Sequence, residues 1–585
     1  MENINIKING MDVSAPKGST ILEAAKLAGI KIPTLCYLKE IGGIGACRVC
    51  VVEVKRARTL VASCCYPITE GMEVFTNTPR VLESRKKTVE LLLSDHRKEC
   101  LACVRDGHCE LQTLAHEVGV QDANEWAGVM SESEIDFSAV HMIRDNSKCV
   151  LCRRCVNICE QVQGVGVIGP NNRGFKTHIS SAFEMGLGET SCISCGQCIA
   201  VCPTGALSEK DSTADVFAAI NDPTKHVLVQ TAPSVRAAVG EEFGFPIGTN
   251  TEGKMAAALR RMGFDKVFDT DFGADLTIME EANEFVQRVT KGGVLPMITS
   301  CSPGWVKFCE HYFPDQLSHL SSCKSPQTMF GAIAKSYYAE KMGWDKKDVV
   351  VVSVMPCTAK KFEIGRPDEC GAGVPDVDYV ITTREFARMV RKLGLDFASL
   401  PDEDFDDPLG EDSGAGVIFG ATGGVMEAAL RTAYETLTGE TLQDPDFKEV
   451  RGTAGIKEAT YKIAGMDVKV AVASGTANAK KVLEKVRSGE ADYKFIEIMG
   501  CPGGCVNGGG QPQVPSYIRN WVDIRAERAK ALYDADKAMP IRKSHENPSI
   551  KKLYAEYLGK PGSEKAEELL HTSFIPRTVN KMPEH

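Results

Sequence analysis

Two cysteine runs constrain the fold of this chain more than any other feature. Both follow the spacing C-x2-C-x2-C-x3-C, and the second ends in Cys202-Pro203. This spacing is typical of proteins that bind two [4Fe–4S] clusters, in which the fourth cysteine of each run ligates the other cluster. One cluster is therefore expected on Cys149, Cys152, Cys155 and Cys202. The other is expected on Cys192, Cys195, Cys198 and Cys159. Such a pair of clusters passes single electrons, so the function should be redox chemistry.

Length and composition place these cysteines in an ordinary globular protein. The 585 residues suggest about four domains. The formal charge of −10 argues against nucleic acid or an anionic membrane as the main partner. No apolar run reaches the roughly 18 residues that span a bilayer. The first ten residues alternate like a strand rather than a signal peptide, so we expect a cytoplasmic protein. In a reducing compartment, 23 cysteines indicate metal sites rather than disulfides.

The cysteine pattern divides the chain into four expected domains of mixed α+β and α/β type. Strand patterns at 5–8 and 50–54 and a short helix at 19–28 dominate the first domain. An apolar stripe at 80–93 predicts a helix in the second. The four domains are a [2Fe–2S] ferredoxin-like domain of β-grasp type at 1–78, a His/Cys3 cluster domain at 79–138, a two-cluster ferredoxin domain at 139–210, and an α/β domain at 211–585.

The last domain alternates short β-branched runs with helical stretches, which predicts an α/β arrangement. The expected strands are 226–230, 266–269, 296–300, 349–354, 380–383, 468–473 and 495–499, and the expected helices include 254–262, 275–289 and 325–341. Three strands run into a cysteine, namely Cys301, Cys357 and Cys501. Because ligands in α/β sheets bind beyond the carboxyl ends of strands, these cysteines are expected to converge. The acidic stretch 402–412 is expected to be a solvated loop, with docking of a partner as the alternative.

The first domain carries a second type of cluster motif. Its cysteines are spaced C-x10-C-x2-C-x13-C, and the set is Cys36, Cys47, Cys50 and Cys64. Two close cysteines flanked by two distant ones are what a plant-type [2Fe–2S] loop requires. The spacing resembles the N-terminal [2Fe–2S] domain of the large iron–sulfur subunit of respiratory complex I. Cys65 is expected to be a bystander, and buried free thiols are the alternative for the set.

The second domain contains a histidine among its candidate ligands. The pattern is H-x3-C-x2-C-x5-C, formed by His96, Cys100, Cys103 and Cys109. It resembles a complex I module in which one [4Fe–4S] cluster is held by three thiolates and one imidazole. The alternative is a structural zinc site of Cys3His type. The iron–sulfur motifs on both sides favour iron.

Three segments of the last domain resemble the signature segments of [FeFe]-hydrogenases. They are TSCSPGW at 299–305, MPCTAKK at 355–361, and EIMGCPGGCVNGGGQP at 497–512. The resemblance extends from about residue 212 to the C-terminus, and it is closest to the subunit type of soluble multimeric NAD(P)-linked enzymes. It implies an H-cluster, which is a [4Fe–4S] cube joined through one cysteine to a two-iron unit carrying CO, CN⁻ and an azadithiolate. Cys357, Cys501 and Cys505 match cube ligands, with Cys505 as the bridge. The glycines at 503–504 and 508–510 are expected to let the backbone approach the cluster.

One departure from the family pattern leaves two roles open. The family usually has Cys-Cys-Pro in its first segment, where the first thiol is the proton donor and the second is the fourth cube ligand. This chain has Cys301-Ser302-Pro303 instead. Counted back from the proline, Cys301 matches the donor and Ser302 the ligand position. The alternative is a shifted loop in which Cys301 ligates the cube.

The same resemblance implies a proton route and a cofactor pocket. The route is Cys301, Glu281, Ser321, Glu284 and Arg288. Glu281, Glu284 and Arg288 share one helix face by spacing, which alone would also suit a solvated surface. Lys360 matches the residue that hydrogen-bonds a cyanide. The residues that match the pocket lining are Pro233, Ser234, Gln327, Met355, Phe419 and Met499. The remaining thiols, Cys309, Cys323 and Cys370, are expected in the core.

The resulting hypothesis is a subunit that interconverts H2 with protons and electrons. Its expected cofactors are one [2Fe–2S] cluster, three accessory [4Fe–4S] clusters and the H-cluster. No nucleotide-binding motif is evident, so a partner NAD(P)/flavin-binding diaphorase subunit and small [2Fe–2S] subunits of a hetero-oligomer are implied by the resemblance. Two rivals are an iron–sulfur assembly protein related to hydrogenases and a pure electron-transfer subunit. The relay residues and Lys360 count against the first, and the three C-terminal segments count against the second.

Overall fold

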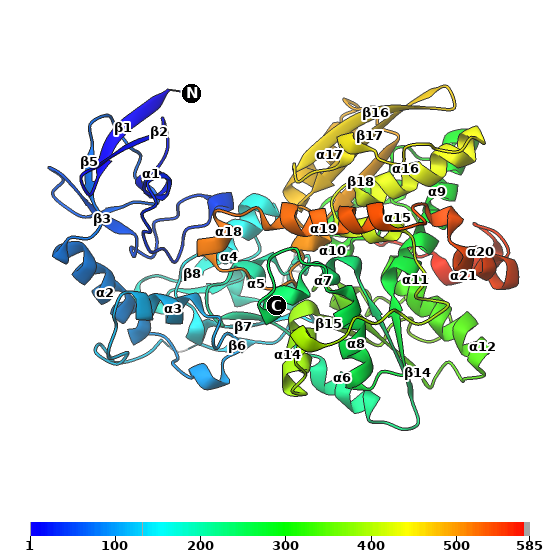
Figure 1. Ribbon diagram of the computed structural model, residues 1–585, viewed down its shortest axis with the longest axis horizontal. Helices are drawn as coiled ribbons and strands as arrows, with labels where there is room; N and C mark the ends of the chain where they lie inside the picture. The colour runs from blue at the N-terminus through cyan, green and yellow to red at the C-terminus, as the bar shows by residue number, and fades with distance from the viewer. Residues whose placement is uncertain (1, 132, 578–585) are drawn as a thin grey trace.

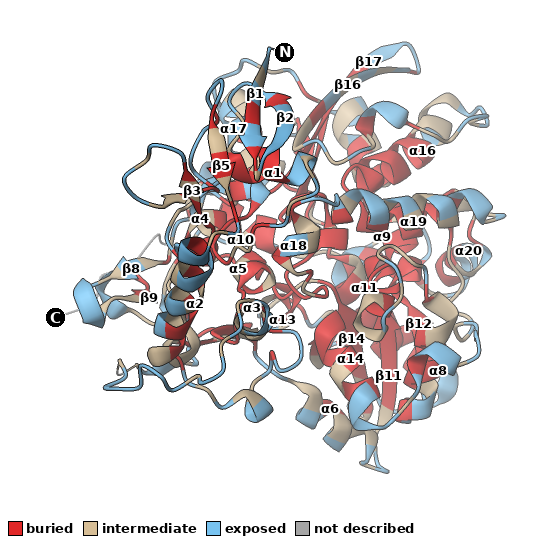
Figure 2. Ribbon diagram, turned by 60° about the vertical axis from the view of Figure 1, so that its left-hand side comes forward, coloured by how far each residue is buried: buried red, intermediate tan, exposed pale blue. Residues whose placement is uncertain are grey.

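The computed structural model describes residues 2–131 and 133–577. The three domains expected to bind clusters form one side of the molecule, coloured blue to cyan in Figure 1, and the larger α/β part forms the other. Burial is greatest in the interior of the α/β part, around α9 (Thr270–Lys291) and β14 (Val349–Met355) (Figure 2). None of the described helices is long and apolar enough to cross a membrane.

The first domain is a five-stranded sheet with one helix. Its strands lie in the order β2-β1-β5-β3-β4. Their bounds are β1 Asn3–Ile8, β2 Met11–Pro16, β3 Val51–Val54, β4 Val61–Ala62 and β5 Glu73–Phe75. Helix α1 (Ile21–Leu27) begins at a capping box formed by Thr20 and Glu23. The first strand pairs parallel with β5 and antiparallel with β2, so the expected β-grasp arrangement is confirmed.

The second domain is built on α2 (Pro79–Ser94) and α3 (Glu110–Glu117). The first helix follows the expected apolar stripe and begins after Thr78, whose hydroxyl accepts from the N–H of Val81. Its buried Arg85 donates to the carbonyl of Val51 at 2.8 Å. This bond fixes α2 against β3 of the first domain.

The third domain has the two-fold layout of a two-cluster ferredoxin. Strands β7 (Met142–Asp145) and β10 (Leu207–Glu209) pair antiparallel, and β6 (Ile135–Asp136) joins β7 at the edge. Each cysteine run leads into a short helix, α4 (Arg154–Asn157) or α5 (Gln197–Val201). A hairpin of β8 (Gly169–Asn171) and β9 (His178–Ser180) lies between them.

Two four-stranded sheets organise the rest of the chain. One is fully parallel in the order β12-β11-β14-β15, and the other is mixed in the order β13-β18-β17-β16. Their remaining bounds are β11 His226–Thr231, β12 Lys266–Asp269, β13 Met297–Ile298, β15 Tyr379–Thr382, β16 Ile456–Ile463, β17 Met466–Ser474 and β18 Phe495–Met499. All seven expected strands are present, whereas β16 was not expected because its residues alternate without a β-branched run.

Helices surround and separate these sheets. They include α8 Glu252–Met262, α10 Pro303–Tyr312, α11 Pro326–Ile333, α13 Lys360–Glu363, α16 Gly424–Thr438, α18 Ser516–Arg519, α19 Ile524–Ala538, α20 Pro548–Leu553 and α21 Glu564–Leu570. The expectation of a solvated loop at 402–412 is wrong in part. Arg260 of α8 bonds Glu403 and Asp406, and Asp406 accepts from the N–H of Val267. The loop therefore closes the edge of the parallel sheet.

Candidate active site and electron-transfer centres

The cysteines at the strand ends do converge, and they come from both sheets. Cys301 and Cys501 follow β13 and β18, which are neighbours in the mixed sheet, while Cys357 follows β14 of the parallel sheet. Burial raises the pKa of the Cys501 thiol, and the next contributions come from Cys357, Cys195 and Cys505. Four thiols of the C-terminal domain therefore lie around one centre, and Cys195 of the ferredoxin domain adjoins it; the four belong to Cys301, Cys357, Cys501 and Cys505.

Cys301 and Ser302 face different parts of this centre. After burial, the groups that act most strongly on the Cys301 thiol are Glu281, Cys505 and Lys360, and its pKa is raised well above the usual value. The Ser302 hydroxyl accepts instead from the N–H of Gly500 at 3.1 Å, directly before Cys501. Ser302 also precedes the first residue of α10, and its backbone is extended there.

The expected pocket residues are buried, and two of them lie against the central thiols. Phe419 and Met499 share an apolar cluster with Cys301 and Cys505. All six residues expected to line the pocket are buried, namely Pro233, Ser234, Gln327, Met355, Phe419 and Met499. Two of them carry polar atoms without a hydrogen-bond partner among the described residues, namely Ser234 Oγ and Gln327 Oε1.

Lys360 is held at this pocket by a residue that the sequence did not single out. Its ammonium group donates to Glu363 at 2.8 Å and lies 3.4 Å from the carbonyl oxygen of Cys301. Glu363 also accepts from the Gln327 amide at 3.0 Å. Lys360 and Glu363 are three residues apart on α13, and that spacing is the sequence signal that could have identified the pair.

At the outer end of the expected proton route, Ser321 and Arg288 are both hydrogen-bonded to Glu284. The Ser321 hydroxyl donates to Glu284 at 2.8 Å, and Arg288 donates to the same carboxylate at 2.6 Å. An open cleft is lined by Glu284, Arg288 and the adjoining Ser322, so this end of the route reaches solvent. At the inner end, Glu281 is 1% exposed, and neither of its carboxyl oxygens has a hydrogen-bond partner among the described residues.

The inner carboxyl group titrates far from its ordinary range. Burial raises the pKa of Glu281 to about 8, and repulsion from Glu284 adds to the effect. The nearby Ser321 hydroxyl lowers it in part. A carboxyl group with a pKa near the working pH can both accept and release a proton. Glu281 therefore has the properties that a relay between Cys301 and Glu284 requires.

The accessory ligands also come together in their expected sets. Each of the thiols of Cys36, Cys47, Cys50 and Cys64 interacts with at least one other member of that set. Cys65 is exposed, with its sulfur 3.5 Å from that of Cys64. Its position outside the buried set agrees with a bystander.

The histidine-containing set lines one cavity of about 320 Å³. That cavity contains His96, Cys100, Cys103 and Cys109 in its wall. The Nδ1 atom of His96 is buried without a hydrogen-bond partner among the described residues. Burial lowers the pKa of His96 to about 4, so the ring is neutral at physiological pH. A neutral imidazole with a free nitrogen is suited to ligate a metal.

The two-cluster domain connects these sites to the central cysteines. Cys36, Cys47, Cys109 and Cys152 belong to one apolar cluster, and a Cβ added at Gly205 would meet Cys103 Sγ at 2.5 Å. A further cavity has all four ligands of the second expected cube in its wall, namely Cys159, Cys192, Cys195 and Cys198. The order of contacts therefore runs from the two N-terminal sites through the ferredoxin domain to Cys357 and Cys501.

The C-terminal glycines allow this connection. A Cβ at Gly509 would lie 2.2 Å from the carbonyl oxygen of Cys195, and one at Gly508 would lie 2.2 Å from that of Pro356. These glycines make room for neighbouring loops. Gln197 donates to the carbonyl of Asn507 at 2.7 Å and adds to the same contact.

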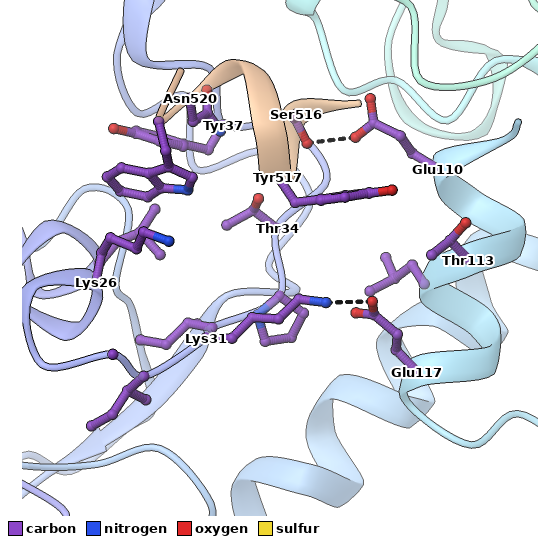
Figure 3. A pocket seen from close by; sticks show the side chains of 17 residues that line it. Lys26, Lys31, Thr34, Tyr37, Glu110, Thr113, Glu117, Ser516, Tyr517 and Asn520 are labelled. Atoms are coloured by element: carbon purple, nitrogen blue, oxygen red, sulfur yellow. Dashed lines mark hydrogen bonds and ion pairs between the residues drawn. The ribbon is translucent and has the colours of Figure 1, made fainter. Parts of the chain in front are cut away.

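A separate cleft of about 240 Å³ lies where the first two domains meet α18 (Figure 3). Ser516 of α18 donates to Glu110 of α3 at 2.5 Å, and Lys31 pairs with Glu117. Arg154 of the ferredoxin domain also bonds Glu110, at 2.8 Å. Glu110 of the second domain therefore bonds both α18 of the last domain and Arg154 of the ferredoxin domain, so hydrogen bonds connect three domains at this point.

Comparison with known proteins supports the same interpretation of the site as an iron–sulfur hydrogenase centre. The chain is 53% identical over 588 residues to the NADP-reducing hydrogenase subunit HndD of Solidesulfovibrio fructosivorans, covering 99% of this chain and 100% of that one. The family model "Iron only hydrogenase large subunit, C-terminal domain" matches residues 225–509. The chain belongs to the [FeFe]-hydrogenase family.

Two further relatives extend the comparison. Iron hydrogenase 1 of Clostridium pasteurianum is 44% identical, covering 97% of this chain and 99% of that one. The solved structure of apo [FeFe]-hydrogenase HydA1 from Chlamydomonas reinhardtii, a variant, is 45% identical with a TM-score of 0.56. It covers 63% of this chain and 99% of its own length.

Four more family models match the remaining regions of this [FeFe]-hydrogenase. A 2Fe-2S iron-sulfur cluster binding domain matches 1–79, the NADH-ubiquinone oxidoreductase-G iron-sulfur binding region matches 85–124, and a 4Fe-4S dicluster domain matches 148–206. The fourth, "Iron hydrogenase small subunit", matches 522–577. The expected cofactor types, namely [2Fe–2S] and [4Fe–4S] clusters and an H-cluster, are thereby confirmed. The small-subunit region was not distinguished from the rest of 211–585 by its sequence pattern.

The residues at the central site fit the H-cluster. Thiolates suit iron–sulfur clusters, and Cys357, Cys501 and Cys505 are the residues that would supply them. The buried polar atoms of Ser234 and Gln327 that have no partner among the described residues suit a polar ligand in this pocket. Lys360 adds a buried ammonium group, which suits an anionic ligand such as cyanide.

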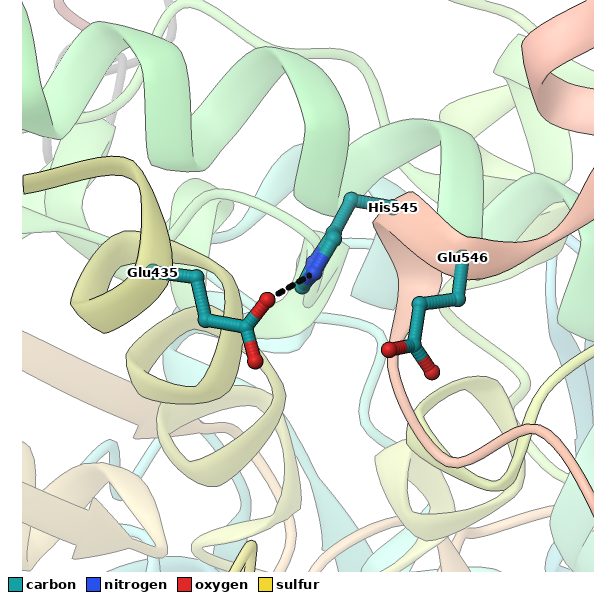
Figure 4. A group of neighbouring side chains, drawn as sticks. All are labelled: Glu435, His545 and Glu546. Carbon is teal, nitrogen blue, oxygen red and sulfur yellow. Dashed lines mark hydrogen bonds and ion pairs between the residues drawn. The ribbon is translucent and has the colours of Figure 1, made fainter. Parts of the chain in front are cut away.

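Other candidate groups in the [FeFe]-hydrogenase have simpler explanations. Glu435, His545 and Glu546 place ligand atoms within 4.8 Å of one another (Figure 4). Lys543 already pairs with both carboxylates, so their charge is compensated without a metal ion. Among the remaining thiols, Cys309 and Cys323 are buried as expected, whereas the expectation for Cys370 is wrong because it is exposed.

Proposed function

We propose that this hydrogenase subunit interconverts H2 with protons and electrons at an H-cluster held by Cys357, Cys501 and Cys505, with Ser302 at the fourth position of the cube. When bound, the H-cluster supplies the reversible cleavage of the H–H bond. The proposal rests mainly on one observation. The loops that follow β13, β14 and β18 bring their cysteines to one buried centre, and Ser234 and Gln327 keep buried polar atoms without partners among the described residues. The surrounding residues exclude water and guide protons.

Cys301 is the proton donor in this proposal. Support comes from its strongest neighbours, since Glu281 and Lys360 act on its thiol while Ser302 is bonded beside Cys501. Protons pass between Cys301 and the carboxyl of Glu281, then through the Ser321 hydroxyl to Glu284. Arg288 fixes the outer carboxylate by two donors, at 2.6 and 3.1 Å, and thereby positions it at the cleft.

Electrons travel by a route with two starting points. The [2Fe–2S] cluster and the His96-ligated cluster both adjoin the cube on Cys149, Cys152, Cys155 and Cys202. The second cube follows, and its ligand Cys195 adjoins Cys357 and Cys501. Such a branched order would let one chain exchange electrons with two different partners.

The proposed partners are an NAD(P)/flavin-binding diaphorase subunit and small [2Fe–2S] subunits. A relative that matches over its full length is named as a subunit of an NADP-reducing hydrogenase, which supports a multi-subunit assembly. The proposed location is the cytoplasm, where the nucleotide is present.

Infrared spectroscopy combined with H2 uptake tests this function. Matured protein should show CO and CN⁻ bands, where no amino acid absorbs, and should reduce an artificial acceptor with H2. A protein with all its accessory iron but without those bands or uptake would be an electron carrier, and the proposal would fail. If H2 uptake persists when the relay residues Glu281, Ser321 and Glu284 are replaced, the hydrogenase activity is supported but the proposed proton route is rejected.

Substitution of Cys301 separates its two possible roles. If Cys301 is the donor, Cys301→Ala should retain the infrared bands and abolish turnover, because the last proton transfer has no acid. If Cys301 ligates the cube, the same change should remove or strongly alter the cubane signal and the attached two-iron unit. Ser302→Cys restores the family's usual pair and should be tolerated under the donor assignment.

A further inference from the structure

His141 is a buried histidine that no part of the proposed mechanism uses. It immediately precedes β7, and its carbonyl accepts from the N–H of Lys210 at 3.1 Å, which extends the pairing of β7 with β10. Its side chain is 2% exposed. Neither ring nitrogen has a hydrogen-bond partner among the described residues. The strand pairing fixes the backbone, so the ring cannot easily turn toward solvent.

The ring of His141 lines a cavity that belongs to one accessory cluster. The wall of this cavity contains the four expected ligands of the second cube, Cys159, Cys192, Cys195 and Cys198. The neighbouring Met142 also lies against this set, with its sulfur 3.9 Å from that of Cys198. His141 is therefore adjacent to the position of a [4Fe–4S] cluster.

An imidazole in this position must present at least one N–H group. The neutral ring carries one N–H in either tautomer, and the protonated ring carries two. Buried donors in proteins nearly always have an acceptor, because an unpaired donor loses its hydration without compensation. No protein atom accepts from His141 among the described residues, whereas the sulfurs of a cluster in this cavity could do so.

The other polar side chains in this cavity wall already have partners. The Gln163 amide donates to Gly500 and accepts from Thr476. Gln197 donates to Asn507, and Arg144 donates to Asp136 through Nη2. Arg144 Nη1 and Gln197 Oε1 remain unpaired among the described residues, and Arg144 contributes a permanent positive charge. His141 differs from all three because its whole polar end is unpaired.

We propose that an N–H group of His141 donates to a sulfur of the cluster on Cys159, Cys192, Cys195 and Cys198 and raises the reduction potential of that cluster. The inference rests on the proposed ligand assignment. One-electron reduction takes the cluster from [4Fe–4S]²⁺ to [4Fe–4S]⁺, with the electron supplied by H2 oxidation. A donor to sulfur stabilises the added negative charge and so favours the reduced state. Because this cluster adjoins Cys357 and Cys501, His141 would tune electron transfer between this cluster and the central site.

Redox titration followed by electron paramagnetic resonance tests this inference in full-length protein expressed without the two-iron unit. His141→Phe and His141→Met remove the donor at similar size, and both should shift the midpoint of this cluster to a more negative potential. His141→Gln keeps an N–H group and should shift it less. His226→Phe is the matched control, because His226 stacks on Trp344 at 4.0 Å away from any expected cluster ligand. It should leave every midpoint unchanged.

Two outcomes would reject the role of His141. The first is an unchanged midpoint in His141→Phe and His141→Met with full iron content. The second is loss of the cluster in all three variants, which would make His141 purely structural. Cys195→Ala tests the ligand assignment separately, since it should abolish the signal of this one cluster. An unchanged signal in Cys195→Ala would refute the assignment itself rather than the hydrogen bond.

Discussion

Replacement of Glu281 by glutamine should block proton transfer and at the same time stabilise the protein at high pH. Glutamine keeps the size and polarity of the side chain but has no titrating proton. In the proposed route, every proton that reaches Cys301 passes through this carboxyl group. We therefore expect H2 turnover to fall by at least about 10²-fold, the lower range for a positioned acid–base group. The CO and CN⁻ bands should persist.

The stability effect follows from the raised pKa of Glu281. Burial raises this pKa from 4.5 to about 8. The folded protein then binds more protons than the unfolded chain between these two values, so its stability falls as the pH rises through that window. At about 1.4 kcal/mol per pKa unit, complete ionisation destabilises the fold by at most about 5 kcal/mol. Glu281→Gln has no charge to bury and escapes this loss.

The assay compares turnover and melting temperature at pH 5 and pH 9. The variant should melt close to the wild type at pH 5 and above it at pH 9, while its turnover stays low throughout. In the wild type, H2 evolution should decline above about pH 8 as Glu281 loses its proton. Glu280→Gln is the matched control, because Glu280 is equally buried on α9 but accepts from Tyr554 and from the N–H of Gly562. Normal turnover in Glu281→Gln, or a melting difference that does not depend on pH, would refute the reasoning.

Three further predictions concern the clusters, the outer relay and the partner. The ligand sets imply about 20 iron atoms per matured chain and about 14 when the H-cluster is missing, which iron analysis can distinguish. Ser321→Ala removes the hydroxyl that donates to Glu284 at 2.8 Å and should slow turnover at least about 10-fold without changing iron content. The isolated chain should reduce a viologen with H2 but not NADP⁺, and direct NADP⁺ reduction would show that no diaphorase subunit is needed.

Local sequence patterns were sufficient to predict those parts of the site in which the spacing of residues determines the chemistry. The ferredoxin runs have this property, because ligands of one cluster must come from both runs and the short helices α4 and α5 follow from that geometry. The strands that end near Cys301, Cys357 and Cys501 were also predictable, since each is a β-branched run followed by a change of pattern. Their convergence followed from the general position of ligand sites in α/β sheets.

Features that depend on contacts between distant segments were not predictable in this way. The composition of the acidic stretch 402–412 predicts a solvated loop. Arg260 on α8 bonds Glu403 and Asp406 and holds them against the sheet, and this contact is not visible in the local sequence. Cys323 and Cys370 were both expected in the core, but Cys323 is buried and Cys370 is exposed. His141 has no motif at all, because its significance lies in which cavity its ring enters.

The pairing of Cys301 with Ser302 in the first signature segment can be understood from the directions in which protons and electrons must move. In the proposed mechanism, electrons are exchanged with the cluster whose ligand Cys195 adjoins Cys501. Protons arrive from α9 through Glu281. Ser302 is bonded beside Cys501, on the electron side, and Cys301 lies with Glu281 and Lys360 on the proton side. A change from cysteine to serine at 302 would then alter the cube without interrupting the proton route. The same change at 301 would interrupt that route, because a hydroxyl group is a much weaker acid than a thiol. The position of the departure is thus compatible with a working hydrogenase, and its expected effect is on the potential of the cube.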